Sequence, residues 1–386
     1  MDTINVLIVD DSALMRNLIG RIVEATPGLA IADKAMNGKF ALDKIPRCDP
    51  DVIVLDVEMP EMDGLQFLRE RRHLGIEIPV IMLSGIAEKG AAVTMQCLEL
   101  GASDFITKPG ISPAEGGLQS VAARLSELLF SYGGQHARRR GKRVQDFIPA
   151  SDAVAAAAIP SVPKAPSHSL DFSSPLFHTA KKEAATITPI RGEGRIEIIA
   201  IGISTGGPNA LREVFAAIKP GIPQPIAVVQ HMPVGFTTEF ANSLNNICPL
   251  TVTEAQDGEI LRGAHVYIAP GNSHIYVAHE DGSAVIKLSD APLRNGHRPS
   301  ADVLFESVAR EFQNRALGII MTGMGNDGAK ELAEMRRQGA RTLGQDETSS
   351  IVYGMPRVAW ELGGVQRQVS LSKMADEIST LAFTYK

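Results

Sequence analysis

The stretch IEIIAIGISTGG, residues 196–207, sets a serine among glycines directly after a run of apolar residues. Such a run predicts a strand that is buried on both faces, as in a parallel sheet. Gly202, Ser204 and Gly206 match G-x-S-x-G, which is a weak signal alone and a better one between a strand and a helix. Backbone N–H groups at the start of that helix can stabilise an anion. The stretch therefore admits three interpretations: a nucleophile, a phosphate-binding turn or an ordinary tight connection.

The same rhythm continues through the second half of the chain. Apolar runs alternate with amphipathic segments of helical period. The predicted strands are residues 196–201, 225–229, 265–269, 284–288 and 317–321, and the predicted helices are residues 211–218, 237–244, 301–312 and 329–338. This alternation is typical of an open α/β sheet. We therefore expect a doubly wound, mostly parallel α/β domain over residues 195–386.

A second α/β pattern occupies the start of the chain. Its apolar runs are residues 5–9, 29–34, 52–55, 80–83 and 104–107, with amphipathic segments between them. The order of these segments predicts a parallel sheet covered on both faces, in a flavodoxin-like domain over residues 1–132. Residues 133–194 then combine paired glycines, a basic run, an alanine patch and scattered prolines without a sustained period. This composition predicts a flexible linker.

The overall composition fits a two-domain globular protein. The chain has 386 residues, 44% of them hydrophobic, and a formal net charge of −6. The negative balance gives no electrostatic reason to expect nucleic-acid binding, and we interpret the basic run 138–143 as a solvated part of the linker. No apolar run approaches the ~18 residues that cross a membrane, and MDTINVLIVDDS lacks the features of a signal peptide. We expect a cytoplasmic protein without membrane insertion.

Acidic residues follow two strands of the predicted first sheet. Asp10 and Asp11 come after the first strand, and Asp56 ends the third. The carboxyl ends of parallel strands meet at one edge, so three like charges converge there and need a compensating cation. Mg²⁺ prefers carboxylate oxygens, so the sequence predicts a magnesium site. Ser84 and Lys108 end two further strands and point to the same crevice.

This set suits the transfer of a phosphoryl group to a carboxylate. A metal ion and a lysine neutralise the phosphoryl oxygens while Asp56 attacks. The motifs IVDDSALMR, LDVEMPEMDG, MLSG and DFITKP resemble the receiver domain of bacterial response regulators. The resemblance implies a phosphoacceptor, Asp56, a Mg²⁺ site made by Asp10, Asp11 and Asp56, and a switch made by Ser84, Phe105 and Lys108.

A serine nucleophile in the second domain needs a base and an orienting acid at the same sheet edge. His231 directly follows the apolar run AVVQ, whereas the other histidines of this domain lie at strand starts, in short strand-like segments or in polar stretches. Asp327 lies in MTGMGNDG, where glycines leave its carboxylate accessible. The order Ser–His–Asp differs from the Ser–Asp–His order of α/β-hydrolases. This order argues against an ordinary lipase or esterase fold. A nucleotide-binding turn is less favoured than a serine nucleophile, because no Walker lysine is present.

The motifs IGISTGG, QHMP, YIAPG, HRPSADVLF and TGMGNDG resemble the catalytic domain of the chemotaxis protein-glutamate methylesterases, the CheB family. With the receiver motifs in front, the resemblance extends over nearly the whole chain. It implies that Ser204 is the nucleophile, His231 the base and Asp327 the group that orients it. It also implies that the backbone N–H of Met324 contributes to an oxyanion hole and that Thr205 and the HRP segment line the cleft.

The resemblance further implies a function. The enzyme would hydrolyse glutamyl methyl esters and deamidate glutamines on methyl-accepting chemotaxis receptors through an acyl-enzyme, with no cofactor for the esterase chemistry. The chemotaxis histidine kinase, CheA, would phosphorylate Asp56 and loosen the receiver from the active site. One alternative is the same hydrolase chemistry in a non-flagellar chemosensory pathway. Others are a receiver with a non-catalytic output domain, such as a DNA-binding one, or a catalytically idle scaffold.

Overall fold

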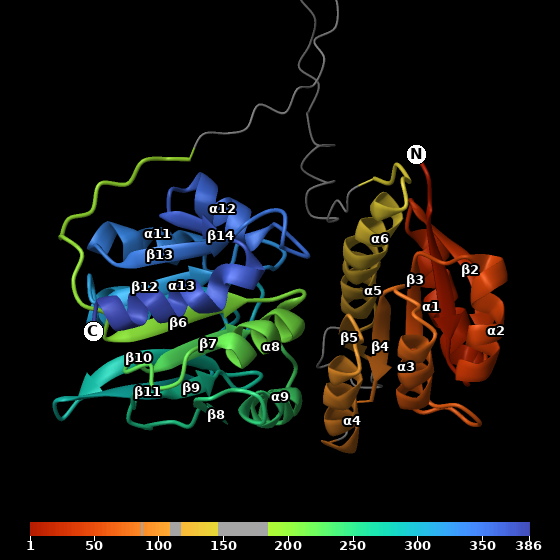
Figure 1. Cartoon of the computed structure of the whole chain (residues 1–386), viewed down its shortest axis with the longest axis horizontal. Helices are drawn as coiled ribbons and strands as arrows, with labels where there is room; N and C mark the ends of the chain where they lie inside the picture. The colour runs from red at the N-terminus through yellow and green to blue at the C-terminus, as the bar shows by residue number, and fades with distance from the viewer. Residues whose placement is uncertain (86–87, 109–116, 146–183) are drawn as a thin grey trace, which may run out of the picture.

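The chain forms two α/β domains that lie side by side in a computed structural model (Figure 1). The structure describes residues 1–85, 88–108, 117–145 and 184–386. The greater part of the predicted linker, residues 146–183, lies outside the described residues, as does part of the loop after Ser84. Within the described residues, no helix is both long enough and apolar enough to cross a membrane.

The N-terminal domain contains one parallel sheet of five strands in the order β2-β1-β3-β4-β5. Its strands are β1 (Ile4–Val9), β2 (Leu29–Ala35), β3 (Val52–Asp56), β4 (Val80–Ser84) and β5 (Asp104–Thr107). Its helices are α1 (Ala13–Ala25), α2 (Gly38–Cys48), α3 (Gly64–His73), α4 (Glu88–Glu99) and α5 (Gly117–Leu128). Every residue of β3 and β4 is buried, as expected for central strands with helices on both faces. This strand order is the flavodoxin-like one, so the predicted fold of this domain is confirmed.

The last helix of this domain continues beyond α5. A π-helical turn (Leu129–Gly133) and α6 (Gly134–Arg139) prolong it into the range assigned to the linker. The chain then folds back: Lys142 Nζ lies 2.6 Å from Asp51 Oδ2, and the Arg143 N–H donates to Asp2 Oδ2 at 2.7 Å. Two side chains of the basic run, those of Arg140 and Lys142, thus form ion pairs with the domain that precedes them.

The C-terminal domain contains a parallel sheet of seven strands in the order β14-β13-β12-β6-β7-β9-β8, and an antiparallel hairpin of β10 and β11. Its strands are β6 (Ile198–Ile203), β7 (Ile226–Gln230), β8 (Thr251–Glu254), β9 (His265–Ile268), β10 (His274–Glu280), β11 (Ser283–Ser289), β12 (Ala316–Ile320), β13 (Arg341–Gln345) and β14 (Arg367–Val369). Its helices are α8 (Gly207–Ala217), α9 (Phe236–Asn245), α10 (Ala301–Glu311), α11 (Ala329–Gln338), α12 (Met355–Glu361) and α13 (Leu371–Thr384). This architecture confirms the doubly wound, mostly parallel α/β prediction.

The order of these strands reverses between β6 and β12. From β6 the sheet grows through β7 in one direction, and from β12 it grows through β13 in the other. Ligand sites of open α/β sheets lie in the crevice outside such a reversal, at the carboxyl ends of the strands. The turns after β6 and β12 carry Ser204 and Asp327, so the fold brings both to this crevice.

The two domains meet along α4, β5 and α5 of the first and α8 and α9 of the second (Figure 1). The Phe105 ring stacks on the Phe236 ring with centroids 4.7 Å apart. The side chain of Asn209 donates to the backbone oxygens of Ala102 and Ser103 at 2.9 and 3.0 Å. The N-terminal end of α8, which directly follows the turn that carries Ser204, is therefore close to the first domain.

Candidate active site and phosphoacceptor site

Ser204 lies on the turn between the buried strand β6 and helix α8. Gly206 has a φ of +77°, which a residue with a side chain rarely adopts, and a Cβ there would lie 2.7 Å from Ile351 Cγ1. Gly323, in the turn that follows the neighbouring strand β12, lies so close that a Cβ there would be 2.8 Å from Ser204 Cβ. The glycines noted in the sequence thus allow a tight turn that brings two strand ends together around one serine.

The structure brings Ser204, His231 and Asp327 into one chain of hydrogen bonds. Nε2 of His231 lies 2.9 Å from Asp327 Oδ2, and Nδ1 lies 3.0 Å from Ser204 Oγ. Because an ionised carboxylate can only accept, Nε2 carries the proton and Nδ1 accepts from the serine hydroxyl. The Gln230 side chain donates to the backbone oxygens of Ser204 and His231, both at 3.1 Å, and so ties the two turns together. In this arrangement a histidine can take the proton of a serine hydroxyl.

Asp327 is buried and accepts more hydrogen bonds than the one from His231. The hydroxyl of Ser300 and the backbone N–H of Ala301 each donate to it at 2.6 Å, and the Asn295 amide donates at 3.0 Å. Burial by itself would raise the pKa of Asp327, but the bonds from His231, Ser300 and Asn295 hold that pKa well below its ordinary value. The carboxylate therefore stays ionised and fixed in orientation.

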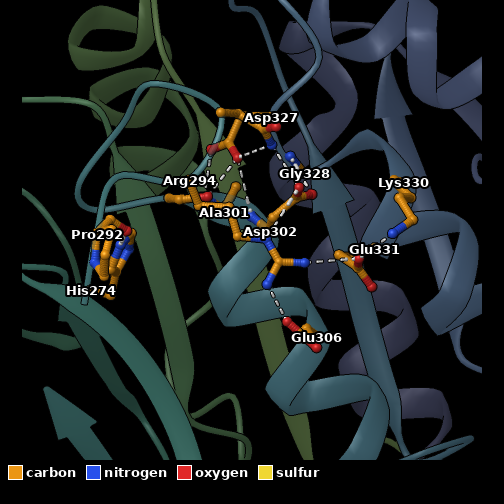
Figure 2. Close-up of polar contacts among 12 residues, drawn as sticks. His274, Pro292, Arg294, Ala301, Asp302, Glu306, Asp327, Gly328, Lys330 and Glu331 are labelled. Carbon is orange, nitrogen blue, oxygen red and sulfur yellow. Dashed lines mark hydrogen bonds and ion pairs between the residues drawn. The ribbon is translucent and has the colours of Figure 1, made fainter. Parts of the chain in front are cut away.

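A second carboxylate, Asp302, lies next to Asp327, and the Asn295 amide donates to both (Figure 2). It accepts from the N–H of Gly328 at 2.9 Å and from the Asn295 amide at 2.6 Å. Burial and the neighbouring charge of Asp327 raise the pKa of Asp302. Arg294 faces this pair and also contacts Glu306 and Glu331. The loop that carries Asp327 is thus supported by an array of charged groups.

The two residues predicted to line the cleft are near the serine. Met324 is half-buried in the turn after β12 and lines a groove between the domains. Thr205 is fully buried, because Arg124 Nη1 of the first domain donates to its hydroxyl at 2.7 Å and the hydroxyl donates to Glu127 at 2.5 Å. Ser204 itself is only 5% exposed. In this structure the first domain covers the approach to the hydroxyl along the Thr205 side.

Sequence reasoning did not identify several residues that hold the three central groups. His297 was assigned only to the lining of the cleft, yet its ring stacks on the ring of His231 with centroids 3.8 Å apart and planes 11° apart. Gln230, Asn295 and Ser300 were not singled out, although each contacts a member of the chain. The Asn-Gly pair at 295–296 was the available signal, because it predicts a tight turn with defined geometry.

At the edge of the first sheet, Asp10, Asp11 and Asp56 offer carboxylate oxygens that all lie within 4.8 Å of one another. Lys108 Nζ lies 2.7 Å from Asp56 Oδ2 and 3.3 Å from Asp10 Oδ2. Burial raises the pKa of Asp56 to about 6, against the opposing effect of Lys108. Asp10 Oδ2 is buried and, apart from this ion pair with Lys108, has no hydrogen-bond partner among the described residues. Three converging carboxylates with such an oxygen fit a hard divalent cation such as Mg²⁺.

The residues predicted to form a switch lie beside this cluster. Ser84 ends β4, is buried, and accepts a hydrogen bond from the Thr94 hydroxyl at 2.6 Å. Phe105, on β5, is the ring that stacks on Phe236 of the second domain. Of the three predicted switch residues, Lys108 pairs with Asp56 of the acid cluster and Phe105 forms part of the contact between the domains. The Ser84 hydroxyl bonds to Gly85, Gly90 and Thr94 in the segment that follows β4.

The fold and the two sites define a class of protein: a receiver domain joined to an α/β domain that carries a serine–histidine–aspartate constellation. Family models agree with both halves, because residues 6–115 match the response regulator receiver domain and residues 199–378 match CheB methylesterase. The protein-glutamate methylesterase/protein-glutamine glutaminase of Treponema denticola is 56% identical over 98% of both chains. Its namesake from Treponema pallidum is 52% identical over 97% of this chain and 96% of its own.

The chain therefore belongs to the family of protein-glutamate methylesterases/protein-glutamine glutaminases with a receiver domain. Among solved structures, the CheB methylesterase catalytic domain of Thermotoga maritima is 34% identical and covers 49% of this chain and 99% of its own, with a TM-score of 0.47. The receiver domain implies a kinase that supplies phosphoryl groups, and the methylesterase domain implies receptor substrates.

Proposed function

We propose that this protein is a phosphorylation-regulated hydrolase that removes methyl groups from glutamyl esters, and deamidates glutamines, on methyl-accepting chemotaxis receptors. The observation that carries the proposal is the hydrogen-bond chain Ser204–His231–Asp327 in a chain of this family. The proposed division is a receiver over residues 1–132, a linker over 133–194 and a catalytic domain over 195–386.

The first half of the proposed reaction acylates the serine. His231 Nδ1 takes the proton of Ser204 as the hydroxyl oxygen attacks the γ-carbonyl carbon of a glutamyl methyl ester. Asp327, which accepts from Nε2–H at 2.9 Å, stabilises the imidazolium that forms. Backbone N–H groups of Thr205 and Met324 are the proposed donors to the oxyanion. The carbon–oxygen bond to the methoxy group then breaks, and the leaving oxygen takes the proton from His231 as methanol departs.

The second half releases the product. Water gives a proton to His231 and attacks the acyl carbon, and the bond to Ser204 breaks as the serine oxygen recovers its proton. A glutamine side chain presents the same carbonyl, with ammonia in place of methanol as the leaving group. One set of residues therefore accounts for both the esterase and the glutaminase reaction. Neither reaction requires a cofactor in the catalytic domain.

The proposed input to this site is phosphorylation of Asp56. Its carboxylate oxygen attacks the phosphorus of a phosphohistidine, and the histidine nitrogen leaves. Asp10, Asp11 and Asp56 are the proposed ligands of Mg²⁺, which when bound neutralises phosphoryl oxygens. Lys108, which pairs with Asp56 at 2.7 Å, neutralises them from the other side. The proposed donor is the chemotaxis histidine kinase, CheA, in the cytoplasm.

Contacts between the domains support the proposal that the unphosphorylated receiver restrains the esterase. Arg124 and Glu127 hold the side chain of Thr205, the residue after the proposed nucleophile. Asp104 accepts a hydrogen bond from the Gly206 N–H at 3.1 Å, at the start of α8. Phe105, the proposed aromatic switch residue, stacks on Phe236. A change at Asp56 that moves Phe105 would therefore loosen the contact nearest the serine.

The decisive experiment measures methanol released from methylated chemoreceptor membranes. Wild type is compared with Ser204→Ala and Asp56→Asn, with and without acetyl phosphate and Mg²⁺, and exposed Ser372→Ala serves as the serine control. We expect a loss of at least about 10⁴-fold for Ser204→Ala. Asp56→Asn is expected to keep basal turnover and lose the response to acetyl phosphate. Methanol release that survives in Ser204→Ala would falsify the proposed mechanism.

The alternatives give different results in the same assay. A non-flagellar substrate predicts little release from chemoreceptor membranes but Ser204-dependent hydrolysis of a small glutamyl methyl ester. An idle scaffold or a non-catalytic output domain predicts no Ser204-dependent hydrolysis of either substrate. The hydrogen-bond chain Ser204–His231–Asp327 favours a catalytic domain over an idle scaffold and over a non-catalytic output domain.

A further inference from the structure

The ring of His231 is restrained along one line by its two hydrogen bonds. Nδ1 binds Ser204 and Nε2 binds Asp327, at 3.0 and 2.9 Å. These bonds fix the line through the two nitrogens but leave the ring free to tilt about it. A flat group against the ring face removes that freedom. His297 supplies such a group, because its ring lies 3.8 Å away and 11° from parallel.

The position of His297 follows from a tight turn. Arg294 and His297 exchange two backbone hydrogen bonds, at 3.1 and 3.0 Å. Between them Asn295 and Gly296 have φ values of 51° and 80°. Positive φ at both central residues is the feature of a type I′ turn, for which Asn-Gly is a preferred pair. The turn therefore presents the side chains of its two flanking residues in a fixed relation.

The same turn is anchored to the group that orients His231. The Asn295 amide donates to both Asp302 and Asp327, at 2.6 and 3.0 Å. Figure 2 shows Arg294 between Asp302, Glu306 and Glu331, on helices α10 and α11. One four-residue turn thus contacts both partners of the proposed nucleophile: Asp327 through Asn295 and His231 through His297.

Further bonds tie down the ends of the loop that carries the turn. Nε2–H of the buried His274 donates to the Pro292 oxygen at 3.1 Å (Figure 2). On the other side, Arg298 donates to the backbone oxygen of Asp290 at 2.7 Å. The platform under His231 is therefore supported from β10 and by both ends of its own loop.

We propose that His297 is a positioning residue, whose ring is the platform that holds the plane of His231 so that Nδ1 faces the serine hydroxyl. The inference rests on the proposed Ser–His–Asp function. Burial and the charge of the adjacent His231 lower the pKa of His297 to about 3, while Asp327 and Arg124 act on it in opposite directions. The platform is thus a neutral ring that does not repel the imidazolium formed during catalysis.

The test replaces the ring in full-length protein with acetyl phosphate and Mg²⁺ present. His297→Ala removes the platform, His297→Leu keeps bulk without a flat ring, and His297→Phe keeps a flat ring without nitrogens. We expect kcat for methanol release to fall about 10- to 100-fold in the Ala and Leu variants with little change in KM, and to recover in Phe. His279→Ala, at an exposed histidine of the same domain, is the matched control.

Three results overturn the inference. If kcat of His297→Phe is as low as that of His297→Ala, a ring nitrogen and not the flat face is needed. A raised KM with unchanged kcat means that His297 only contacts substrate. If His297→Ala and His297→Leu keep the kcat of wild type, no platform is required. If Ala does not fold, judged by its melting transition, the comparison of Leu with Phe decides the question. Activity in Ser204→Ala in the same assay would instead show that the proposed function itself is wrong.

Discussion

The two domains use the same edge of the same kind of sheet for opposite electrostatic purposes. In the receiver, Asp10, Asp11 and Asp56 converge with one lysine, so the site has an excess of negative charge. In the catalytic domain, a neutral hydroxyl, an imidazole and a single carboxylate are linked in a line. The first arrangement suits the binding of a cation, whereas the second already links a hydroxyl, an imidazole and a carboxylate in one chain of hydrogen bonds.

The comparison also shows where each site gets its precision. In the receiver, the carboxylates and the lysine are positioned by the ends of the strands β1, β3 and β5. The ion pair between Lys108 and Asp56 then fixes their side chains. Asp327 lies several residues beyond β12 and depends on Ser300, Ala301 and Asn295 to hold it. A site that carries out acyl transfer needs this second layer of contacts, because small misplacements cost large factors in rate.

The largest expected effect tests the linear arrangement. Asp327→Asn should lower kcat for methanol release by about 10⁴-fold, because an amide no longer selects the His231 tautomer with its proton on Nε2. Phosphorylation of Asp56 by acetyl phosphate, followed as incorporated label, should be unchanged.

The neighbouring buried carboxylate offers a matched comparison. Asp302→Asn should lower kcat for methanol release much less than Asp327→Asn does, because Asp302 bonds to Asn295 and Gly328 and not to the imidazole of His231. Equal losses in the two variants would mean that the array acts as a whole and that Asp327 has no special relation to His231.

The second prediction concerns the charged site of the receiver. Lys108→Ala should abolish the stimulation of methanol release by acetyl phosphate, because the ammonium that pairs with Asp56 no longer neutralises the phosphoryl oxygens. Allosteric coupling of this kind is typically about 5- to 150-fold, and the ratio of stimulated to basal rate should fall to about one. Lys44→Ala, whose lysine pairs with Asp33 on the far side of the domain, is the control. If Lys108→Ala keeps the wild-type ratio of stimulated to basal rate, Lys108 does not have the proposed role at the phosphoryl oxygens.

The third prediction weakens the contact between the two sites. Glu127→Ala leaves the half-buried Arg124 without its carboxylate and removes the acceptor of the Thr205 hydroxyl. Such losses cost about 1–3 kcal/mol, so the basal rate without phosphodonor should rise by about fivefold or more. Glu24→Ala, exposed on α1, should leave the basal rate unchanged. An unaltered basal rate in Glu127→Ala would show that this contact does not restrain the esterase.

Sequence patterns predicted both sheets and the groups at their strand ends, since apolar runs and strand-end residues are local features. They did not predict β8, β13 or β14, which are short or interrupted by Gly and polar residues. They also did not reveal the roles of Asn295 and Ser300, because their bonds to Asp327 join segments more than 20 residues apart. The contact of Arg124 with Thr205 spans 81 residues and is equally invisible to local pattern.

The last prediction concerns stability and not activity. It tests, through the pH dependence of the melting temperature, whether the His297 ring stays neutral in the folded protein. The pKa of His297 is about 3 in the folded protein, against an ordinary value of 6.5. Below about pH 6.5 the unfolded chain therefore binds a proton that the folded chain does not, and wild type loses stability as the pH falls from 6.5 toward 3. Phenylalanine cannot titrate, and pH 5 lies about 1.5 units below the ordinary pKa, which corresponds to about 2 kcal/mol. The melting temperature of His297→Phe minus that of wild type should therefore increase between pH 7.5 and pH 5, by roughly 4–8 °C. Leu293→Ala, on the same loop, removes no titratable group and should show a difference that does not change with pH. A pH-independent difference for His297→Phe as well would mean that His297 accepts a proton in place, and the platform beside His231 would then carry charge.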